Sequence, residues 1–387
     1  MRKALIVSTV SRQFFLFERC NIDVLQSLGY EVHAAANFCD ESDRLSEVPI
    51  VRHPFCIRRS PFSLQNIAAY RQLKRLMMAE EFDLVHCHSP VGGVLARIAA
   101  KAVRLSPVIY TTHGFHFYGG APVINWLLYY PVERILARST DLLITINQED
   151  FRRARSFGAK NVSYVPGIGI DTGKYHDAPV DKDQKRDELR LPRGAFLLLS
   201  VGELNKNKNH EAILRALAAI HDPNIQYAVC GQGPLEGYLR RLAKSLGVES
   251  RFHLLGYRND LPEVYPAADV FLLPSYREGL SASMLESMCC GLPVVCSDIR
   301  GNRDLIQHGE GGYLAKPGDV EGFAACIMRL AGNEELRAAM GRRNRDEAGK
   351  YCQETVKHEM AALYESCAAC RTVTKSNKAA RMYEVIE

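Results

Sequence analysis

The sequence lacks any apolar run near the roughly 18 residues that a membrane-spanning helix needs. Its first eight residues hold only about five apolar side chains before the chain turns polar, which is too short for the apolar core of a secretory signal. Apolar residues make up 47% and charged residues 24% of the 387 residues, so the composition excludes a disordered, collagen-like or coiled-coil protein. We therefore expect a cytoplasmic globular protein, either free or peripheral on the inner face of the cell membrane.

Patterns that hold metal ions are also scarce. Cys367 and Cys370 form the one C-x-x-C pair, and no second pair stands at the distance of a zinc site. Cysteines in apolar strand-like runs, such as Cys87 and Cys230, are expected to be buried free thiols of a reducing compartment. The one D-x-D pattern, at residues 181–183, lies in a polar segment and is expected to be solvated. We therefore expect no metal ion and no cofactor.

The net charge of +5 is concentrated in the first half of the chain. Residues 1–175 carry 21 Lys and Arg against 15 Asp and Glu, whereas residues 176–387 carry 28 against 29. Such an excess fits an anionic membrane surface, an anionic substrate or nucleic acid. Because no nucleic-acid recognition motif is present, we do not expect nucleic acid as a partner.

Short apolar runs typical of buried strands alternate with helical patterns along the whole chain. This alternation predicts parallel sheets covered by helices on both faces. The expected strands lie at residues 4–8, 31–36, 84–88, 108–112 and 142–146 in the first half, and at 196–201, 226–230, 252–255, 270–273 and 294–297 in the second.

We therefore predict an α/β protein of two Rossmann-like doubly wound domains that face each other across a cleft. Ligands of such sheets bind at the carboxyl ends of the strands, so the cleft is the expected site. The expected parts are an N-terminal domain at 1–175, a hinge or linker at 176–194, a C-terminal domain at 195–350, a helix at 351–370 that packs back on the first domain, and a polar tail at 371–387.

Residues 272–286 form the first segment whose residue types suggest ligand binding. A strand ends there, a turn with Gly279 follows, and a helix begins near Ser281. The amides of such a turn, with the Ser281 hydroxyl, can hold a diphosphate at a helix N-terminus. Glu278 precedes the turn and Glu286 lies in the helix, so both can flank one ligand. The alternative is an ordinary capped helix with two solvated glutamates.

Residues 200–210 repeat this plan, with a strand, a turn at Gly202 and a polar loop that enters a helix. Lys206 or Lys208 can neutralise a phosphate as a point charge. The alternative is a solvated basic loop.

The third stretch, residues 111–120, places His113 and His116 among aromatic residues and glycines directly after a strand. Aromatic rings pack on the faces of sugars, and neutral imidazoles form hydrogen bonds with hydroxyl groups. We expect His113 to lie in a sugar pocket. His86 and His88 lie inside a strand and are expected to be structural.

Basic residues and apolar residues alternate in the first domain in a way that suits an anionic lipid surface. The alternative is a set of solvated helix faces beside an interior aromatic cluster. The basic residues are Arg58, Arg59, Arg71, Lys74, Arg75, Arg97, Lys101 and Arg104; the apolar ones are Leu64, Ile67, Leu73 and the run at 126–130.

Together these stretches resemble the retaining, nucleotide-sugar-dependent glycosyltransferases of family four, which have the GT-B fold. Glu278 to Glu286 is similar to the E-x7-E signature in its Glu-Gly-Leu-Ser form. The resemblance covers about residues 1–365 and includes the segments 202–208, 112–114, 165–171 and 317–319. More narrowly, residues 86–93, 113–118 and 298–303 resemble bacterial capsule and exopolysaccharide transferases.

The resemblance implies roles for individual residues. Glu286 would bind the donor ribose, and the backbone amides of Gly279, Leu280 and Ser281 would hold the diphosphate. Glu278 would contact hydroxyl groups of the donor sugar, Lys208 would stabilise the departing nucleoside diphosphate, and His113 would contact the sugar near the reacting carbon. Gly202 and Lys206 complete the implied donor site.

Two departures from the family pattern stand in this chain. Glu203 occupies the position where the family usually has arginine, so one diphosphate contact is missing unless Lys206 replaces it. Residues 8–12 replace the usual Gly-Gly loop on the acceptor side.

The implied activity is a metal-independent, retaining transfer of a hexosyl or N-acetylhexosaminyl group from a nucleotide-sugar, with uridine the usual base. The acceptor would be a glycan or a polyprenyl-diphosphate-linked glycan in surface polysaccharide biosynthesis. Two alternatives stay open: a non-hydrolysing sugar-nucleotide 2-epimerase, which the Glu278–Glu286 spacing does not favour, and a non-catalytic partner subunit that binds only donor or lipid.

Overall fold

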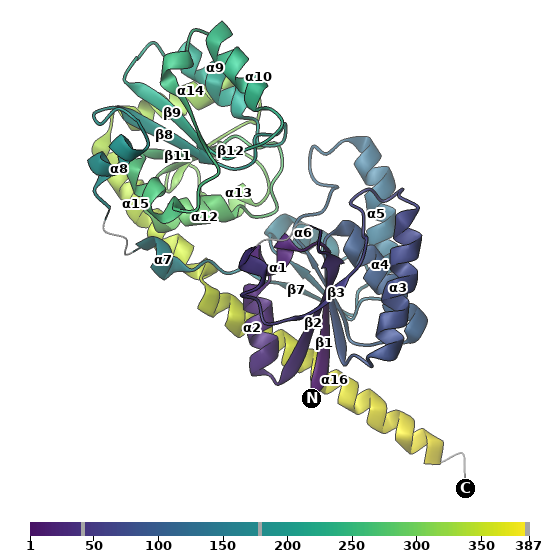
Figure 1. The fold of residues 1–387 in the computed structure, drawn as a ribbon. Helices are drawn as coiled ribbons and strands as arrows, with labels where there is room; N and C mark the ends of the chain where they lie inside the picture. Colours follow the sequence, from purple (N-terminus) through teal and green to yellow (C-terminus); the bar gives the residue numbers. More distant parts are fainter. Residues whose placement is uncertain (40–42, 177–179, 384–387) are drawn as a thin grey trace. The chain divides into compact units, whose positions relative to one another are not determined.

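The structure, a computed structural model, describes residues 1–39, 43–176 and 180–383. It divides into two compact units, of which the first comprises Met1–Gly169 with Gln353–Glu387 and the second Ile170–Cys352. Each unit contains one fully parallel sheet with helices on both faces (Figure 1). The prediction of two doubly wound α/β domains is therefore confirmed.

Seven strands form the sheet of the first unit in the order β3-β2-β1-β4-β5-β6-β7. The strands are β1 (Arg2–Val10), β2 (Tyr30–Asn37), β3 (Val51–Pro54), β4 (Leu84–His88), β5 (Val108–Thr112), β6 (Leu142–Thr145) and β7 (Asn161–Tyr164). The helices are α1 (Arg12–Leu16), α2 (Arg19–Ser27), α3 (Gln65–Ala79), α4 (Pro90–Val103), α5 (Val123–Ala137), α6 (Gln148–Ala154) and α16 (Gln353–Tyr383).

Strand β1 divides the core of this unit between the two faces of its sheet. Successive side chains of a strand point to opposite faces, so Leu5 and Val7 pack with residues of α3 and α4, while Ala4 and Ile6 pack with residues of α2 and α16. Because both faces are covered, the strand is apolar throughout, as a buried parallel strand must be.

Six strands form the sheet of the second unit in the order β10-β9-β8-β11-β12-β13. The strands are β8 (Phe196–Val201), β9 (Ile225–Cys230), β10 (Phe252–Gly256), β11 (Val270–Leu273), β12 (Val294–Ser297) and β13 (Gly312–Ala315). The helices are α7 (Thr172–His176), α8 (Lys182–Glu188), α9 (His210–Ala219), α10 (Glu236–Ser245), α11 (Leu261–Ala267), α12 (Ala282–Cys289), α13 (Asn302–Leu305), α14 (Val320–Ala331) and α15 (Glu334–Ala348).

The segment expected to be a hinge, 176–194, contains helix α8. Its side chain Lys185 is buried and pairs with Asp260 at 2.8 Å, and Arg186 is buried and pairs with Asp269 at 2.8 Å. The polar composition that suggested a linker therefore reflects an ion-paired helix on the second unit. Asp181 of the D-x-D pattern caps α8 through its carboxylate.

The unit boundaries also differ from those expected. The first unit ends at Gly169 and not at 175, because α7 belongs to the second unit. Helix α16 returns to the first unit, where Val356, Met360 and Tyr364 recur every four residues along one buried face. This helix continues to Tyr383, through most of the segment expected to be a tail; residues 384–387 lie outside the described residues.

Candidate functional site

Two loops of the second unit meet at the carboxyl ends of neighbouring strands, β8 and β11. The loop after β8 carries Asn207, whose side-chain amide donates to the carbonyl of Arg277 at 2.9 Å. In return, the amide of Tyr276 donates to the carbonyl of Asn207 at 2.8 Å. These reciprocal hydrogen bonds hold the loop after β8 against the loop after β11, at the edge where parallel sheets bind ligands.

Lys208 and Glu278 form an ion pair where these loops meet. Nζ of Lys208 lies 2.7 Å from Oε1 of Glu278, and their side chains are only 19% and 13% exposed. Asn205 accepts a hydrogen bond from the amide of Lys208 at 3.0 Å. The side chain of Lys208 crosses Gly202, where an added Cβ would lie 3.0 Å from Cε of the lysine. The glycine thus leaves the lysine room to reach across.

Ser281 begins helix α12 directly after Gly279 and Leu280. Its Oγ accepts a hydrogen bond from the amide of Met284 at 3.3 Å, which is the usual N-cap contact. The carbonyl of Gly279 lies so close to Gly301 that a Cβ there would stand 2.2 Å from it. This close approach fixes the turn, whose amides precede the positive end of the helix.

Glu286 lies in α12 with its carboxylate buried. Oε2 accepts a hydrogen bond from the hydroxyl of Tyr265 at 2.7 Å, and the hydroxyl of Tyr175 also bonds this carboxylate. Burial raises the pKa of Glu286, against the opposing effect of the two tyrosine hydroxyls. Neither tyrosine was predicted from the sequence, since neither belongs to a motif and Tyr175 lies in the segment expected to belong to the first domain.

Lys206 is exposed on the loop after β8, as is Glu203. Among the residues that the structure describes, no ion pair joins the two. Of the residues predicted from sequence for the donor side, the structure brings Gly202, Lys208 and Glu278 into contact. Gly279, Leu280 and Ser281 follow Glu278 in the same turn.

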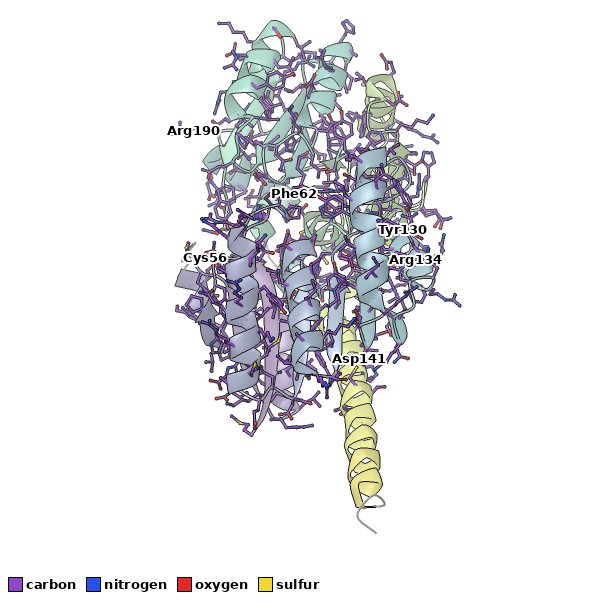
Figure 2. The ribbon with its side chains drawn as sticks, turned by 90° about the vertical axis from the view of Figure 1, so that its right-hand side faces the viewer. Cys56, Phe62, Tyr130, Arg134, Asp141 and Arg190 are labelled. Atoms are coloured by element: carbon purple, nitrogen blue, oxygen red, sulfur yellow. The ribbon has the colours of Figure 1, made fainter. Side chains whose placement is uncertain are left out.

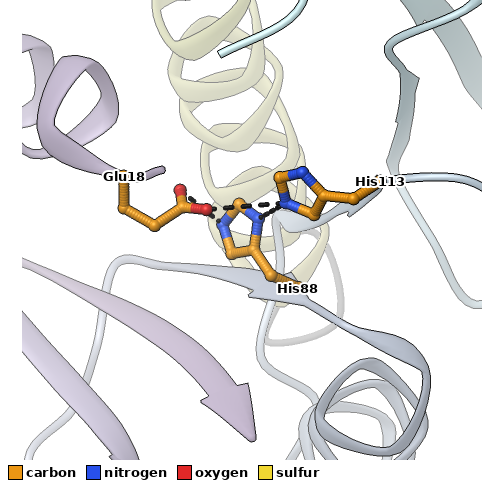
Figure 3. Close-up of side chains that lie close together, drawn as sticks. All are labelled: Glu18, His88 and His113. Atoms are coloured by element: carbon orange, nitrogen blue, oxygen red, sulfur yellow. Dashed lines mark hydrogen bonds and ion pairs between the residues drawn. The ribbon is translucent and has the colours of Figure 1, made fainter. Parts of the chain in front are cut away.

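His113 belongs to a separate cluster in the first unit, together with Glu18 and His88 (Figure 3). His88 ends β4 and His113 follows β5, which pairs with β4 so that His88 stands beside Thr111. Nε2 of His88 lies 3.0 Å from Oε2 of Glu18, and Nδ1 of His88 lies 3.2 Å from Nε2 of His113. Glu18 and His88 are fully buried, whereas the side chain of His113 is 26% exposed.

Burial and charge act in opposite directions within this cluster. Burial works against the charged form of Glu18, but the adjacent His88 and His113 outweigh it and hold the pKa of this carboxyl well below its usual range. Burial lowers the pKa of His88 to about 4, although Glu18 acts against this shift. Near neutral pH the cluster therefore contains an ionised carboxylate beside a neutral His88.

The interpretation of His88 as a structural residue of a strand interior was incomplete, because its ring reaches the carboxyl end of the sheet. The alternation of His86 and His88 on one face was a usable signal. His86 itself is held between Tyr364 at 2.7 Å and Thr111 at 2.8 Å and is structural. Nothing in the sequence around Glu18 indicated a function, since it is a single acidic residue after an apolar run.

The donor set of this cluster is compatible with a metal ion, because one ligand atom from each residue lies within 4.8 Å of the others. A small, largely apolar pocket of about 20 Å³ borders His113 and is also lined by Phe17, Thr111 and Met360.

Helix α5 exposes apolar residues on one side of the first unit, the side turned to the viewer in Figure 2. Val123, Leu127 and Ile135 are 72%, 67% and 64% exposed. Before α3, Phe62 and Leu64 are 76% and 81% exposed. We call these residues the apolar face.

Some residues of the proposed lipid surface lie elsewhere. Arg97 was expected beside Lys101 and Arg104 on one surface, but it is fully buried and pairs with Glu133 at 2.8 Å. Leu73 is buried in the core as well. Arg58, Arg59, Arg71, Arg75, Lys101 and Arg104 are exposed. Among the described helices, none is long and apolar enough to cross a bilayer.

Comparison with known proteins identifies related chains for both units. The family "Glycosyl transferases group 1" matches residues 181–347, and "Glycosyl transferase 4-like" matches residues 3–147. The "Putative glycosyltransferase EpsD" of Bacillus subtilis (strain 168) is 38% identical over 384 residues, which cover 97% of this chain and 99% of that protein. The "UDP-Gal:alpha-D-GlcNAc-diphosphoundecaprenol alpha-1,3-galactosyltransferase" of Escherichia coli is 31% identical and covers 78% of each chain.

Solved structures give the same fold. Anabaena Alr3699/HepE, crystallised with UDP-glucose, superposes with a TM-score of 0.79 over 95% of this chain and 100% of that chain, at 21% identity. The sucrose-phosphate synthase of Thermosynechococcus elongatus superposes with a TM-score of 0.78 over 96% of this chain and 100% of that chain, at 17% identity.

Proposed function

This chain belongs to the family-four glycosyltransferases of the GT-B fold, which take nucleotide-sugars as donors, and from this premise we propose the finer assignment that follows. The protein transfers a hexosyl or N-acetylhexosaminyl group from a UDP-sugar to a glycan or polyprenyl-diphosphate-linked acceptor, with retention of configuration, in surface polysaccharide biosynthesis. The E. coli relative supports the donor and acceptor classes through its name, which gives UDP-Gal and a diphosphoundecaprenol-linked sugar.

The ion pair of Lys208 and Glu278 beside the start of α12 is the observation that carries this proposal. It gathers a cation, a carboxylate and a helix N-terminus at the carboxyl ends of β8 and β11. A diphosphate is held by such a terminus and by a positive side chain. Glu286, whose carboxylate already accepts from Tyr265, is the proposed partner of the ribose hydroxyls.

The proposed reaction breaks the bond between the anomeric carbon and the diphosphate oxygen and forms one between that carbon and the acceptor oxygen. Negative charge develops on the leaving diphosphate, so the contribution of Lys208 and the amides of Gly279, Leu280 and Ser281 is electrostatic. The acceptor attacks from the face that the diphosphate leaves, and its proton passes to the diphosphate. Glu278 and His113 contact the sugar. No step requires a metal ion, and Lys206 supplies the charge that Glu203 does not.

The apolar face and the basic residues near it support a peripheral site on an anionic membrane. Exposed apolar side chains insert at the level of the lipid headgroups, while each lysine or arginine near the surface adds about 1 kcal/mol. This contact would bring a lipid-linked acceptor to the first unit.

Calorimetric titration tests the donor assignment. UDP, GDP, ADP and several UDP-sugars are titrated in the absence of metal, against the wild type and Glu286→Ala. We expect UDP to bind in the micromolar range and at least tenfold more weakly to the variant. Turnover is then measured with a polyprenyl-diphosphate-linked glycan. Failure of every nucleotide to bind a folded sample would favour a partner subunit, and an epimerised UDP-sugar formed without acceptor would favour a 2-epimerase.

A further inference from the structure

The imidazole of His88 contacts the carboxylate of Glu18 with one nitrogen and the imidazole of His113 with the other (Figure 3). Nε2 of His113 also lies 3.6 Å from Oε1 of Glu18. The ring of His88 therefore connects a fully buried charge to a side chain that reaches solvent. His86 packs against the ring with centroids 4.1 Å apart, but hydroxyl groups occupy both of its own nitrogens. His86 thus supports the ring without competing for its partners.

Amide donors hold the carboxylate of Glu18 in place. Gln13 donates to Oε1 at 2.8 Å, and Asn21 donates to Oε2 at 2.6 Å. Hydrogen bonds of this kind stabilise the ionised form. An ionised carboxylate only accepts hydrogen bonds. Nε2 of His88 lies 3.0 Å from Oε2 of Glu18 without the angle of a hydrogen bond. A proton on this nitrogen keeps its lone pair from facing the carboxylate, so we place the proton of His88 there.

A neutral imidazole has one N–H, and the other nitrogen offers a lone pair. With the proton of His88 on Nε2, its Nδ1 is an acceptor, and the group within reach is Nε2 of His113 at 3.2 Å. His113 then donates from Nε2. Its Nδ1 has no hydrogen-bond partner among the residues that the structure describes, and it becomes the free acceptor of the chain.

We propose that Glu18 and His88 are positioning residues which keep the proton of His113 on Nε2, so that Nδ1 accepts a hydrogen bond from a hydroxyl group of the donor sugar. The sugar contact rests on the proposed function; the proton arrangement does not. A hydroxyl held by Nδ1 would fix the rotation of the sugar as the anomeric bond breaks, which is a gain in orientation.

Gln13 provides the competing arrangement. Its Nε2 lies 3.1 Å from Nε2 of His113 and could donate there if His113 carried its proton on Nδ1. That state requires His88 to donate from Nδ1 as well as to face a carboxylate with Nε2, and it therefore requires a doubly protonated His88. Burial disfavours the charged ring at neutral pH.

The test is 15N NMR of the full chain labelled at histidine, at pH 7, with His113 assigned from His113→Gln. The 15N shifts distinguish a protonated from an unprotonated ring nitrogen. We expect Nε2 of His113 to be protonated and Nδ1 to be unprotonated in the wild type. Both Nδ1 of His88 and Oε1 of Glu18 face Nε2 of His113, so the double variant Glu18→Gln/His88→Phe removes both acceptors. Gln13 then remains as a donor to Nε2, and the proton should move to Nδ1. In Glu18→Gln/His88→Asn, an acceptor oxygen near the position of Nδ1 of His88 should restore the wild-type state.

The chain contains a matched control in a second Glu–His–His series. Nε2 of His33 lies 3.1 Å from Oε2 of Glu31, and Nδ1 of His33 lies 2.9 Å from Nε2 of His53. Glu31→Gln should leave the His113 signals unchanged, whereas Glu18→Gln should populate both tautomers of His113. Thermal melting of each variant checks that it is folded.

Three results would overturn the inference: a proton on Nδ1 of His113 in the wild type, an unchanged tautomer in the folded double variant Glu18→Gln/His88→Phe, or an equimolar zinc ion that is lost in that variant. The proposed function fails separately, if no donor is turned over while the tautomers are as expected. Where turnover occurs, Glu18→Gln should lower kcat about tenfold or more with little change in KM for the donor, and Glu31→Gln should not.

Discussion

Nζ of Lys208 lies 2.7 Å from Oε1 of Glu278, although 70 positions separate the two residues in the sequence. Each side chain is less than a fifth exposed, so the pair is held in place before any ligand arrives. Part of the rotamer entropy of the lysine is thus lost on folding and not on binding. A bound diphosphate would share this cation with Glu278.

Lys208→Ala is the first prediction. If the lysine stabilises the leaving diphosphate, its removal should lower kcat by about 10²–10³, equal to about 2.7–4 kcal/mol of barrier. Initial rates at saturating donor measure this change. Lys244→Ala, an exposed lysine of α10, is the control and should keep wild-type rates. A folded Lys208→Ala with more than a third of wild-type kcat would remove the lysine from the mechanism.

Glu286→Gln should weaken UDP binding without lowering the free energy of unfolding. Burial raises the pKa of this carboxyl in the folded protein above its unfolded value of 4.5, so ionisation costs stability as the pH rises through the folded pKa. The neutral amide avoids that cost. The free energy of unfolding in urea at pH 8 should therefore not fall, whereas UDP should bind about tenfold more weakly because a charged acceptor is lost.

Tyr265→Phe provides the comparison for this prediction. It removes the hydroxyl that donates to Glu286 and leaves the buried charge with one tyrosine partner fewer. Its stability at pH 8 should fall by about 1–3 kcal/mol. Equal losses of stability in Tyr265→Phe and Glu286→Gln would contradict the description of Glu286 as a buried carboxylate whose ionisation costs stability.

Local sequence patterns predicted most of the fold and the loop residues of the second unit. The alternation of apolar runs and helical patterns predicted ten of the thirteen described strands, because buried parallel strands such as β1 have no polar face. The three strands that were not predicted, β3, β7 and β13, lie at sheet edges. Lys208 and Glu278 were predictable because they follow β8 and β11, two neighbouring strands whose carboxyl ends lie side by side. Local patterns did not predict which side chains from distant parts of the sequence contact these residues.

Three misses illustrate this limit. Glu18 lies far from His88 in sequence and belongs to no motif, so only the packing of α2 on the sheet brings them together. Arg97 has the spacing of an exposed basic face, but it pairs with Glu133 of another helix and is buried. Lys185 lies in a segment of linker composition, yet acidic residues of the second unit hold it. In each case a tertiary contact between polar side chains overrode the local pattern.

Vesicle sedimentation tests the membrane surface. The double variant Leu127→Glu/Ile135→Glu should reduce binding to phosphatidylglycerol vesicles at least tenfold, because burying each of these side chains contributes about 1.5–3 kcal/mol. Met328→Glu places one such carboxylate at an exposed apolar site of the second unit and should bind as the wild type does. Equal binding to vesicles of phosphatidylcholine alone would argue against the electrostatic contribution of the basic residues.

The buried pair of Arg97 and Glu133 should be sensitive to the loss of one partner. Arg97 also donates to the carbonyl of Gly93 at 3.0 Å and stacks on Tyr110 at 3.9 Å. Arg97→Ala leaves a buried carboxylate unpaired, so the free energy of unfolding should fall by about 3–5 kcal/mol. Urea denaturation of Arg97→Ala and of the double variant Arg97→Met/Glu133→Leu compares the two cases. The double variant should have the larger free energy of unfolding of the two. If it does not, the ion pair itself stabilises the fold.

Acid should destabilise the protein before its carboxylates are protonated. Burial lowers the pKa of His88 and of His210 to about 4 and that of His86 well below its usual value. Between pH 6.5 and 4 the unfolded chain therefore binds more protons than the folded one, and stability falls as the pH falls through this range. Each such histidine contributes up to about 1.4 kcal/mol per pH unit to the slope.

His210→Gln tests this pH dependence in the second unit. The imidazole of His210 is buried, with Nδ1 2.9 Å from the hydroxyl of Tyr227, and glutamine can bond that hydroxyl without titrating. The free energy of unfolding, measured in urea from pH 7 to 4.5, should depend less steeply on pH in this variant. His221→Gln changes an exposed histidine and should keep the wild-type slope. If His210→Gln keeps the wild-type pH dependence, His210 binds its proton equally well in the folded and the unfolded protein. Burial would then not lower its pKa.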